Sequence, residues 1–216
     1  MTQATEGRVG PGRPRDPELA RQRREAILRQ AVTHFARDGF AKADMGAIAV
    51  DAGCAKGTIY NYFKSKGDLF RASVDYVMQG LLAATHSSGA KDPVERLGHA
   101  IRSFLAYFDA HPEYIELLIQ ERAQFKDRDD PTYLKYRETN CEQARAAFRS
   151  LIQAGRFRDV PVDRTLDNLR NLLYGTIFNN HFAGRGTSLE QQAEDIKDLL
   201  LHGLLSPAES ARMKTK

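Results

Sequence analysis

The sequence lacks the features that mark membrane-spanning, secreted and disulfide-stabilised proteins. Its apolar runs are only a few residues long, whereas a helix that spans a bilayer needs about 20 apolar residues. The N-terminus carries no apolar stretch of the kind found in secretory signals. The two cysteines, Cys54 and Cys141, cannot form a disulfide framework. We therefore expect a cytoplasmic protein in a reducing compartment, with no membrane partner.

Signatures of catalysis and of bound cofactors are also missing. The histidines are scattered, and neither an HExxH nor a CxxC spacing occurs. The chain has no glycine-rich nucleotide-binding loop and no arguable Ser-His-Asp or Cys-His arrangement. We expect no enzymatic activity, no cofactor and no metal. One conceivable ligand set, His111 with Glu113 and Glu116, lacks an i, i+4 histidine pair, and it leaves a metal-responsive protein as an alternative.

The positive charge of the chain is concentrated in its first third. The net charge of the 216 residues is +4. Residues 1–71 hold 13 Lys and Arg against 8 Asp and Glu, whereas the remainder has a net charge of −1. Such an asymmetry is typical of a nucleic-acid-binding head on a neutral body. A basic tail without a binding partner would give the same charge distribution.

The hydrophobic pattern predicts helices throughout. From residue 18 onward apolar residues recur at spacings of three and four, and we find neither strand alternation nor an internal repeat. The pattern predicts an all-α chain of about nine helices, with a three-helix head and a larger helical body. The expected helices begin near residues 18, 44, 56, 65, 92, 112, 131, 163 and 188, and the one that begins at 131 is expected to continue to 155.

One pair of short predicted helices has the proportions of a helix-turn-helix. Between Asp44 and Phe63 the two helices are joined by a tight turn that contains Gly53. Asp44 is the expected N-cap of the first helix, and glycine takes the positive φ of a sharp turn without strain. The second helix carries groups that reach phosphates and base edges, on Lys56, Thr58, Tyr60, Asn61, Tyr62 and Lys64.

Residues 24–70 resemble the DNA-binding domain of the TetR (tetracycline-repressor) family. The resemblance rests on Phe35 to Gly39, Ile48-Ala49, Ala52-Gly53, the run Lys56-Gly57-Thr58-Ile59-Tyr60-Asn61-Tyr62-Phe63-Lys64-Ser65-Lys66, and the apolar pair Leu69-Phe70. Two positions depart from the family's pattern. Ala43-Asp44 stands just before the first helix of the motif, where the family usually has Thr or Ser, and Ala55 stands just before the second helix, where the family usually has Ser. Since Asp44 repels phosphate and Ala55 donates no hydrogen bond, we expect fewer phosphate contacts at these two points.

The resemblance implies a division into three parts. Residues 1–17 would be a disordered basic arm, residues 18–70 the helix-turn-helix DNA-binding domain, and residues 71–216 the ligand-binding and dimerisation domain. In the arm, Gly12-Arg13-Pro14-Arg15 resembles an AT-hook core that inserts arginine into a narrow minor groove, and a merely solubilising tail is the alternative. The expected DNA contacts of arm and motif are Lys56, Gly57, Thr58, Tyr60, Asn61, Tyr62, Lys66, Arg13, Arg15 and Arg24.

The body is rich in aromatic residues, which would line a core or an apolar effector cavity. We expect a small, largely apolar effector, with polar groups on apolar faces to orient it. The candidate ligand-binding residues are Phe104, Phe108, Tyr114, Leu118, Glu121, Tyr136, Asn140, Phe148, Tyr174, Phe178 and His181.

The last two predicted helices have wide Leu and Ile faces. These faces either complete the core of one chain or, as the resemblance implies, pair across a two-fold axis in a four-helix bundle. We favour a homodimer because two half-sites raise the affinity for a palindromic operator. The candidate interface residues are Leu166, Leu169, Leu173, Ile177, Ile196, Leu199, Leu200 and Leu204.

These observations lead to a functional hypothesis. We expect a ligand-responsive transcriptional regulator, most simply a repressor, that binds double-stranded operator DNA as a homodimer. The effector would shift the two heads away from the spacing of successive major grooves, about 34–36 Å, through the helix from Ser65 to about Thr85. An architectural DNA-binding protein without an effector is the other alternative, besides the metal-responsive regulator.

Overall fold

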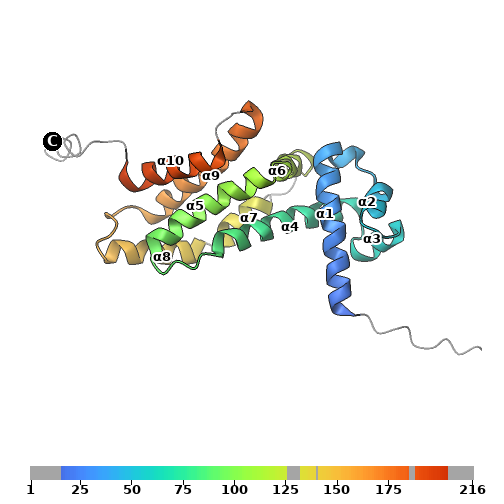
Figure 1. The fold of residues 1–216 in the computed structure, drawn as a ribbon, viewed down its shortest axis with the longest axis horizontal. Helices are drawn as coiled ribbons and strands as arrows, with labels where there is room; N and C mark the ends of the chain where they lie inside the picture. Colours follow the sequence, from blue (N-terminus) through green and yellow to red (C-terminus); the bar gives the residue numbers. More distant parts are fainter. Residues whose placement is uncertain (1–15, 126–131, 140, 185–187, 204–216) are drawn as a thin grey trace, which may run out of the picture.

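The computed structural model describes residues 16–125, 132–139, 141–184 and 188–203 as an assembly of helices without strands (Figure 1). The prediction of an all-α fold is confirmed. The helix expected from residue 131 to 155 consists of two elements in the described chain, which gives ten helices there. They are α1 (Pro17–Lys42), α2 (Met45–Asp51), α3 (Lys56–Tyr62), α4 (Lys66–His86), α5 (Pro93–Ala110), α6 (Glu113–Gln124), α7 (Thr132–Thr139), α8 (Cys141–Gln153), α9 (Val162–Ala183) and α10 (Leu189–His202).

Local capping explains where the helices of the head begin. Asp44 Oδ1 accepts hydrogen bonds from the N–H groups of Gly46 and Ala47, both at 2.8 Å, so the predicted cap of α2 is confirmed. At the start of α4, Ser65 Oγ accepts from the N–H of Asp68 and donates to its carboxylate, which gives this helix a capping-box-like start.

Helix α1 changes direction near its C-terminal end. Gly39 has φ 77° and ψ 158°, a conformation outside the helical region that glycine adopts without strain. The regular part of α1 ends at this glycine. A short additional turn continues to Lys42, where the N–H of Ala43 donates to the carbonyl of Gly39 at 3.0 Å.

The head and the body lie at opposite ends of an elongated molecule and share one helix. Helices α1, α2 and α3 form the head, and α4 runs from the head into the body, where it lies beside α5 (Figure 1). The buried core is continuous from Ile27 and Phe35 in α1, through Phe70 in α4, to Leu117 in α6. The expected domain boundary between residues 70 and 71 therefore falls inside a helix that belongs to both parts.

Within the body, α5 occupies a central position and contacts α4, α9 and α10. Its contact with α4 depends on Gly80, where an added Cβ would lie 2.4 Å from Tyr107 Oη. Tyr107 uses this space to donate a hydrogen bond to the carbonyl of Val77 at 2.7 Å. Burial raises the pKa of the Tyr107 phenol above its ordinary value, as expected for a group that packs between two helices. Among the described helices, none is long and apolar enough to cross a membrane.

Candidate functional site

The helix-turn-helix forms as the sequence predicts. Gly53 has φ 64° in the turn between α2 and α3, and the N–H of Cys54 donates to the carbonyl of Ala49 at 2.9 Å. Ile48, Ala49 and Ile59 are buried where the two helices meet α1. Helix α3 has no side-chain cap, because its N-cap residue is Ala55. The motif therefore owes its rigidity to the packing of its apolar face.

The face of α3 away from this core is polar and exposed. Lys56, Gly57, Tyr60 and Asn61 are exposed, with Tyr60 44% accessible. Neither Tyr60 nor Asn61 makes a hydrogen bond to another described residue, so both side chains keep their donors and acceptors for a ligand.

The predicted contact residues Thr58 and Tyr62 are only partly accessible. The ring of Tyr62 packs near Phe63, with centroids 6.3 Å apart.

Two further predicted contact residues have partners within the chain. The Lys66 ammonium donates to the carbonyl of Ala41 at 2.9 Å and lies 5.4 Å from the centre of the Phe40 ring. The Arg24 guanidinium lies 5.4 Å from the centre of the Phe63 ring while remaining exposed. The predicted contacts Arg13 and Arg15 lie outside the described residues.

A buried histidine fixes α2 against α1. His34 is 3% exposed, and its Nε2 lies 2.7 Å from Asp51 Oδ2 at the end of α2. Arg37 Nη2 lies 3.2 Å from His34 Nδ1. Since a guanidinium can only donate, Nδ1 accepts from Arg37 and Nε2 carries the hydrogen that Asp51 accepts. This chain of polar contacts holds the first helix of the motif in register with α1.

The head is joined to the body by a side-chain amide that bonds to the backbone of the α1 kink. From α6, Gln120 Nε2 donates to the carbonyl of Phe35 at 2.9 Å, and Gln120 Oε1 accepts from the N–H of Phe40 at 3.0 Å. These backbone groups flank Gly39, where the regular hydrogen-bond ladder of α1 is interrupted. The amide supplies a donor and an acceptor in place of the lost helical partners.

Four aromatic rings pack around the same junction. Phe70 of α4 lies 5.0 Å from Phe35, 5.3 Å from Phe40 and 5.6 Å from Phe125, measured between ring centres. The Arg71 guanidinium covers Phe125 at 5.5 Å from its centre and also pairs with Asp68. The start of α4, the kink of α1 and the end of α6 therefore form one rigid contact.

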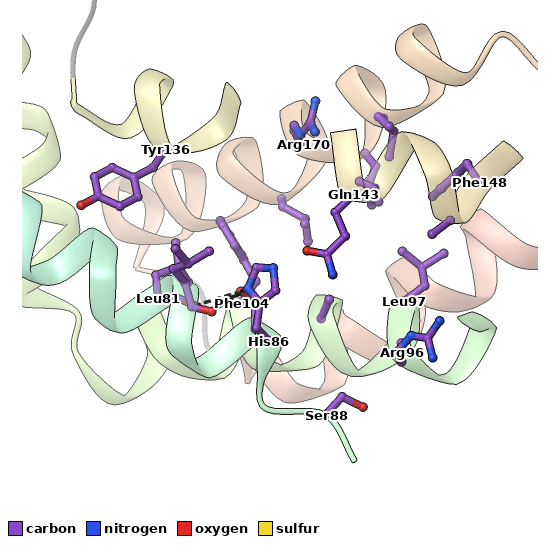
Figure 2. Close-up of a pocket in the computed structure, with 18 of the residues that line it drawn as sticks. Leu81, His86, Ser88, Arg96, Leu97, Phe104, Tyr136, Gln143, Phe148 and Arg170 are labelled. Carbon is purple, nitrogen blue, oxygen red and sulfur yellow. Dashed lines mark hydrogen bonds between the residues drawn. The ribbon is translucent and has the colours of Figure 1, made fainter. Parts of the chain in front are cut away.

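The body contains a largely apolar pocket with a cavity volume of about 360 Å³, bounded by α4, α5, α7, α8 and α9 (Figure 2). This size lies within the range of small-molecule sites, about 300–1,000 Å³. In Figure 2 the side chains of His86 and Gln143 extend into the open space between the helices. The lining residues are Met78, Leu81, Leu82, Thr85, His86, Ser88, Pro93, Arg96, Leu97, Ala100, Phe104, Tyr136, Gln143, Ala144, Ala147, Phe148, Leu151, Leu166, Leu169, Arg170, Leu173 and Tyr174.

The structure brings some of the predicted effector-binding residues to this pocket. Phe104, Tyr136, Phe148 and Tyr174 line it. The sequence pattern does not identify the contribution of α4, whose Met78, Leu81, Leu82, Thr85 and His86 line the pocket. It also does not identify the polar lining groups Gln143 and Arg170, because neither belongs to the apolar pattern of its helix.

Other predicted effector-binding residues lie elsewhere. Phe108 and Leu118 are buried in the general core. Tyr114 stacks on His111 at 4.5 Å between α5 and α6, and Phe178 packs against the core outside the pocket lining. Asn140 lies outside the described residues.

Two predicted polar ligands of the effector have structural partners instead. Glu121 is buried, and its carboxylate accepts from the N–H of Thr132 at 2.9 Å and from the Thr132 hydroxyl. It thereby holds the first residue of α7 on α6. His181 Nε2 lies 3.3 Å from Glu116 Oε2, away from the pocket lining.

Most of the predicted dimer-interface residues face the interior of the single chain, so their assignment needs correction. Leu166, Leu169, Leu173, Ile177 and Ile196 are between 0% and 8% exposed, and a partner could not reach them. The first three line the pocket. Leu199 is 40% exposed and Leu200 is partly buried, whereas Leu204 lies outside the described residues.

The conceivable metal ligands do not form a cluster. His111 Nδ1 lies 3.4 Å from Glu113 Oε1, whereas Glu116 bonds to Gln120 and His181. Within the described part of the chain, no group of three His, Cys, Asp or Glu side chains could hold a metal ion.

Residues 27–73 match the family described as "Bacterial regulatory proteins, tetR family". The chain is 35% identical over 117 residues to the HTH-type transcriptional repressor SCO4008 of Streptomyces coelicolor, which covers 54% of this chain and 57% of that protein. It is 26% identical over 199 residues to the HTH-type transcriptional repressor KstR2 of Mycolicibacterium smegmatis, covering 88% of this chain and 95% of that protein.

The fold is also that of a solved structure. The fatty acid degradation regulator FadR from Bacillus halodurans superposes with a TM-score of 0.70 at 20% identity, covering 89% of this chain and 98% of that one.

These findings define the class first: an all-helical protein with a helix-turn-helix of the kind found in bacterial transcriptional regulators. Residues 27–73 of the chain are therefore a DNA-binding domain of the TetR type. The match to SCO4008 spans a little over half the length of that repressor.

Proposed function

We propose that this protein is a ligand-responsive transcriptional repressor that binds a palindromic operator as a homodimer and is released by a small, largely apolar effector. The observation that carries the proposal is the course of α4. Its first residues, near Lys66, pack against the head, whereas Met78, Leu81 and His86 near its end line the pocket. A single helix of about 30 Å, at 1.5 Å per residue, therefore connects the two sites.

The DNA-binding surface would be the exposed face of α3. In a helix-turn-helix the second helix enters the major groove and the first crosses the backbone. Tyr60 and Asn61 are exposed and keep their hydrogen-bonding groups for base edges or phosphates. Lys56 would contact phosphate, and Lys66 would act mainly by supporting α1, because its ammonium already bonds to Ala41.

The homodimer would form through the outward face of α9. Leu172 and Phe182 are exposed on this helix, 39% and 72% accessible, and Gly175 lies between them with open space around it. The exposed positions Asn168 and Asn179 on the same face are uncharged. Depletion of charge around exposed apolar side chains is typical of the centre of a protein interface, and glycine permits close approach of a partner helix. Leu199 of α10 would extend the surface.

Effector binding would act by shifting a population of head orientations. An effector that pushes α4 away from α8 and α9 changes the tilt of α4, and the contact of Phe70 with Phe35 transmits this tilt to α1, which Gln120 holds on α6. Two heads that no longer match grooves about 34–36 Å apart lose the operator. A coupling free energy of about 1–3 kcal/mol, the usual range, releases DNA effectively.

The deciding experiment is selection of genomic fragments by the purified protein, followed by footprinting at fixed salt concentration. The expected result is a protected palindrome whose two half-sites are one helical turn or a multiple of it apart. Uniform binding to all fragments that falls steeply with salt would contradict the proposal and support the architectural alternative. The metal-responsive alternative predicts that dialysis against a chelator abolishes operator binding, whereas the present proposal predicts no change.

A further inference from the structure

The ionisable side chains that line the effector pocket carry only one sign of charge. Among the described residues that line it, Arg96 and Arg170 are cationic, His86 can become so, and none is aspartate or glutamate. Composition does not explain this bias, because residues 72–216 hold 20 acidic and 19 basic residues. The wall of the pocket is thus selectively depleted of negative charge.

Arg170 is the most enclosed of these cationic groups. Its side chain is only 18% exposed, in contrast to the exposed Arg96 at the pocket's other side (Figure 2). Its ion pair with Asp167 is a long one, with Nη1 and Oδ1 3.4 Å apart, and the Asp167 carboxylate is half exposed to solvent. The guanidinium has five N–H donors, so this contact leaves capacity for a second anion.

The other two basic side chains already donate hydrogen bonds to the backbone. Arg96 Nη1 donates to the carbonyl of Lys91 at 2.7 Å. His86 Nδ1 donates to the carbonyl of Leu82 at 2.8 Å. Both side chains are exposed to solvent, which screens the attraction of the Arg96 charge for an anion, whereas the more enclosed Arg170 can form a direct hydrogen-bonded pair.

The size of the cavity limits the ligand. If a non-hydrogen atom with its hydrogens takes about the volume of a water molecule, roughly 30 Å³, the cavity of about 360 Å³ holds about a dozen such atoms. The apolar lining, with Leu81, Phe104, Leu166 and Leu169, requires that most of these atoms be hydrocarbon.

We propose that the effector is a small apolar carboxylate whose carboxylate group is bound by Arg170 while its hydrocarbon part fills the pocket. This inference rests on the proposed function and adds the charge of the ligand to it. Moving a carboxylate from water into an apolar pocket costs free energy, which a charged hydrogen-bonding partner must compensate. The planar guanidinium suits this role because two of its N–H groups can bond to the two carboxylate oxygens. A cationic ligand would meet positive charge with no acidic group on the pocket wall.

The test is direct calorimetric titration of the full chain, without DNA, using matched ligands. Octanoate, octanol and octylamine share one tail shape, and phenylpropanoate, phenylpropanol and phenylpropylamine share another. We expect one of the carboxylates to bind at least about tenfold more tightly than the alcohol with the same tail, and the amine to bind most weakly.

Variants then assign the preference to one side chain. In Arg170→Gln the dissociation constant of the carboxylate should rise about tenfold or more, while that of the alcohol stays unchanged. Arg170→Lys, which keeps the charge but not the fork, should retain part of the preference and guards against a folding defect in the first variant. Arg149→Gln, at an exposed position of α8 outside the pocket, is the matched control and should bind like the wild type.

Three results would overturn the inference: alcohols or amines that bind as tightly as the carboxylates, a carboxylate preference that persists in Arg170→Gln, or no binding of any of the six compounds. Operator release is measured separately. A carboxylate that binds through Arg170 without releasing DNA would contradict the proposed function alone. Release of DNA by an alcohol or amine, with no carboxylate binding, would contradict this inference alone.

Discussion

Single side chains on α3 differ in whether the protein itself uses them. Asn61 is exposed and forms no hydrogen bond to another described residue, whereas Ile59, two positions earlier, is fully buried. Substitutions at the two positions should therefore affect different quantities. Asn61 should affect DNA binding and Ile59 should affect stability.

We expect Asn61→Ala to raise the operator dissociation constant about tenfold or more at fixed salt concentration, since a specific base contact contributes about 1–3 kcal/mol. The melting temperature should not change, because the side chain has no partner to lose. Ile59→Ala, by contrast, should lower the free energy of unfolding by about 2–5 kcal/mol. Gel-shift titration and thermal unfolding of both variants check this. If the Asn61 variant binds the operator as tightly as the wild type, the proposal that α3 contacts base edges through Asn61 is contradicted.

Asp92 shows how one carboxylate can serve two contacts at the residue scale. Its Oδ2 accepts from Arg156 Nη1 at 2.5 Å, and its Oδ1 accepts from the N–H groups of Val94 and Glu95 at the start of α5. The bond from Arg156, followed by those from the backbone, lowers the pKa of Asp92 from 3.8 to about 2. The folded state therefore favours the ionised form.

Because the pKa is lower in the folded state, the resulting stabilisation is complete above the ordinary value of 3.8 and is lost as the pH falls through about 2. Wild type should be more stable than Asp92→Asn at neutral pH, and this difference should shrink across that acidic range. Thermal unfolding as a function of pH measures it, with Asp159→Asn at an exposed position as the control. A constant difference down to the lowest pH would show that the ionised carboxylate is not the source.

At the scale of helices, the joint between α6 and α1 depends on one amide. Gln120→Leu keeps much of the side-chain volume but leaves the N–H of Phe40 and the carbonyl of Phe35 without this partner. Leaving such part-buried groups unsatisfied should lower the free energy of unfolding by about 1–3 kcal/mol. Chemical denaturation of Gln120→Leu and of Gln124→Leu, an exposed position on the same helix, should show a loss only in the first. Equal stabilities would mean that water replaces the amide.

The helices themselves could be predicted from the sequence to a large extent, and their roles in the site less so. The periodic pattern in α4 and the caps at Asp44 and Ser65 depend on neighbours within a few residues, so they are visible in the sequence. The pocket depends on which helices meet in space. Apolar periodicity shows that a face of α9 is covered, but Leu169 would look the same against a partner, a core or an effector.

At the scale of the whole molecule, apolar periodicity likewise does not show which face of α9 would contact a second protomer. The strongest apolar stripe of α9 belongs to the chain's own interior, and the large apolar residues that α9 exposes are Leu172 and Phe182. The proposed interface leaves a weak signal in the sequence, because its large apolar positions are few. Exposure in the folded chain was needed to propose it.

If α9 carries the dimer contact, a charge placed on its outward face should separate the protomers. Leu172→Asp should give a monomer in sedimentation experiments at micromolar concentration, because the carboxylate and its symmetry mate would be buried together without compensation. Operator affinity should fall with it, since one head contacts only one half-site. Leu19→Asp, at an exposed leucine of α1, should leave the oligomeric state unchanged. A dimeric Leu172→Asp protein would place the interface elsewhere.

The bond between Gln120 and the kink of α1 has a consequence for engineering. Both atoms that Gln120 holds belong to the main chain, so their positions depend on the backbone conformation at Gly39 and not on which side chains the head carries there. A foreign head with the same glycine kink and a compatible aromatic contact would present the same two atoms. Grafting such a head onto this body should therefore preserve the hydrogen-bonded part of the joint, and a chimeric protein could combine a new operator preference with the sensing of the original effector.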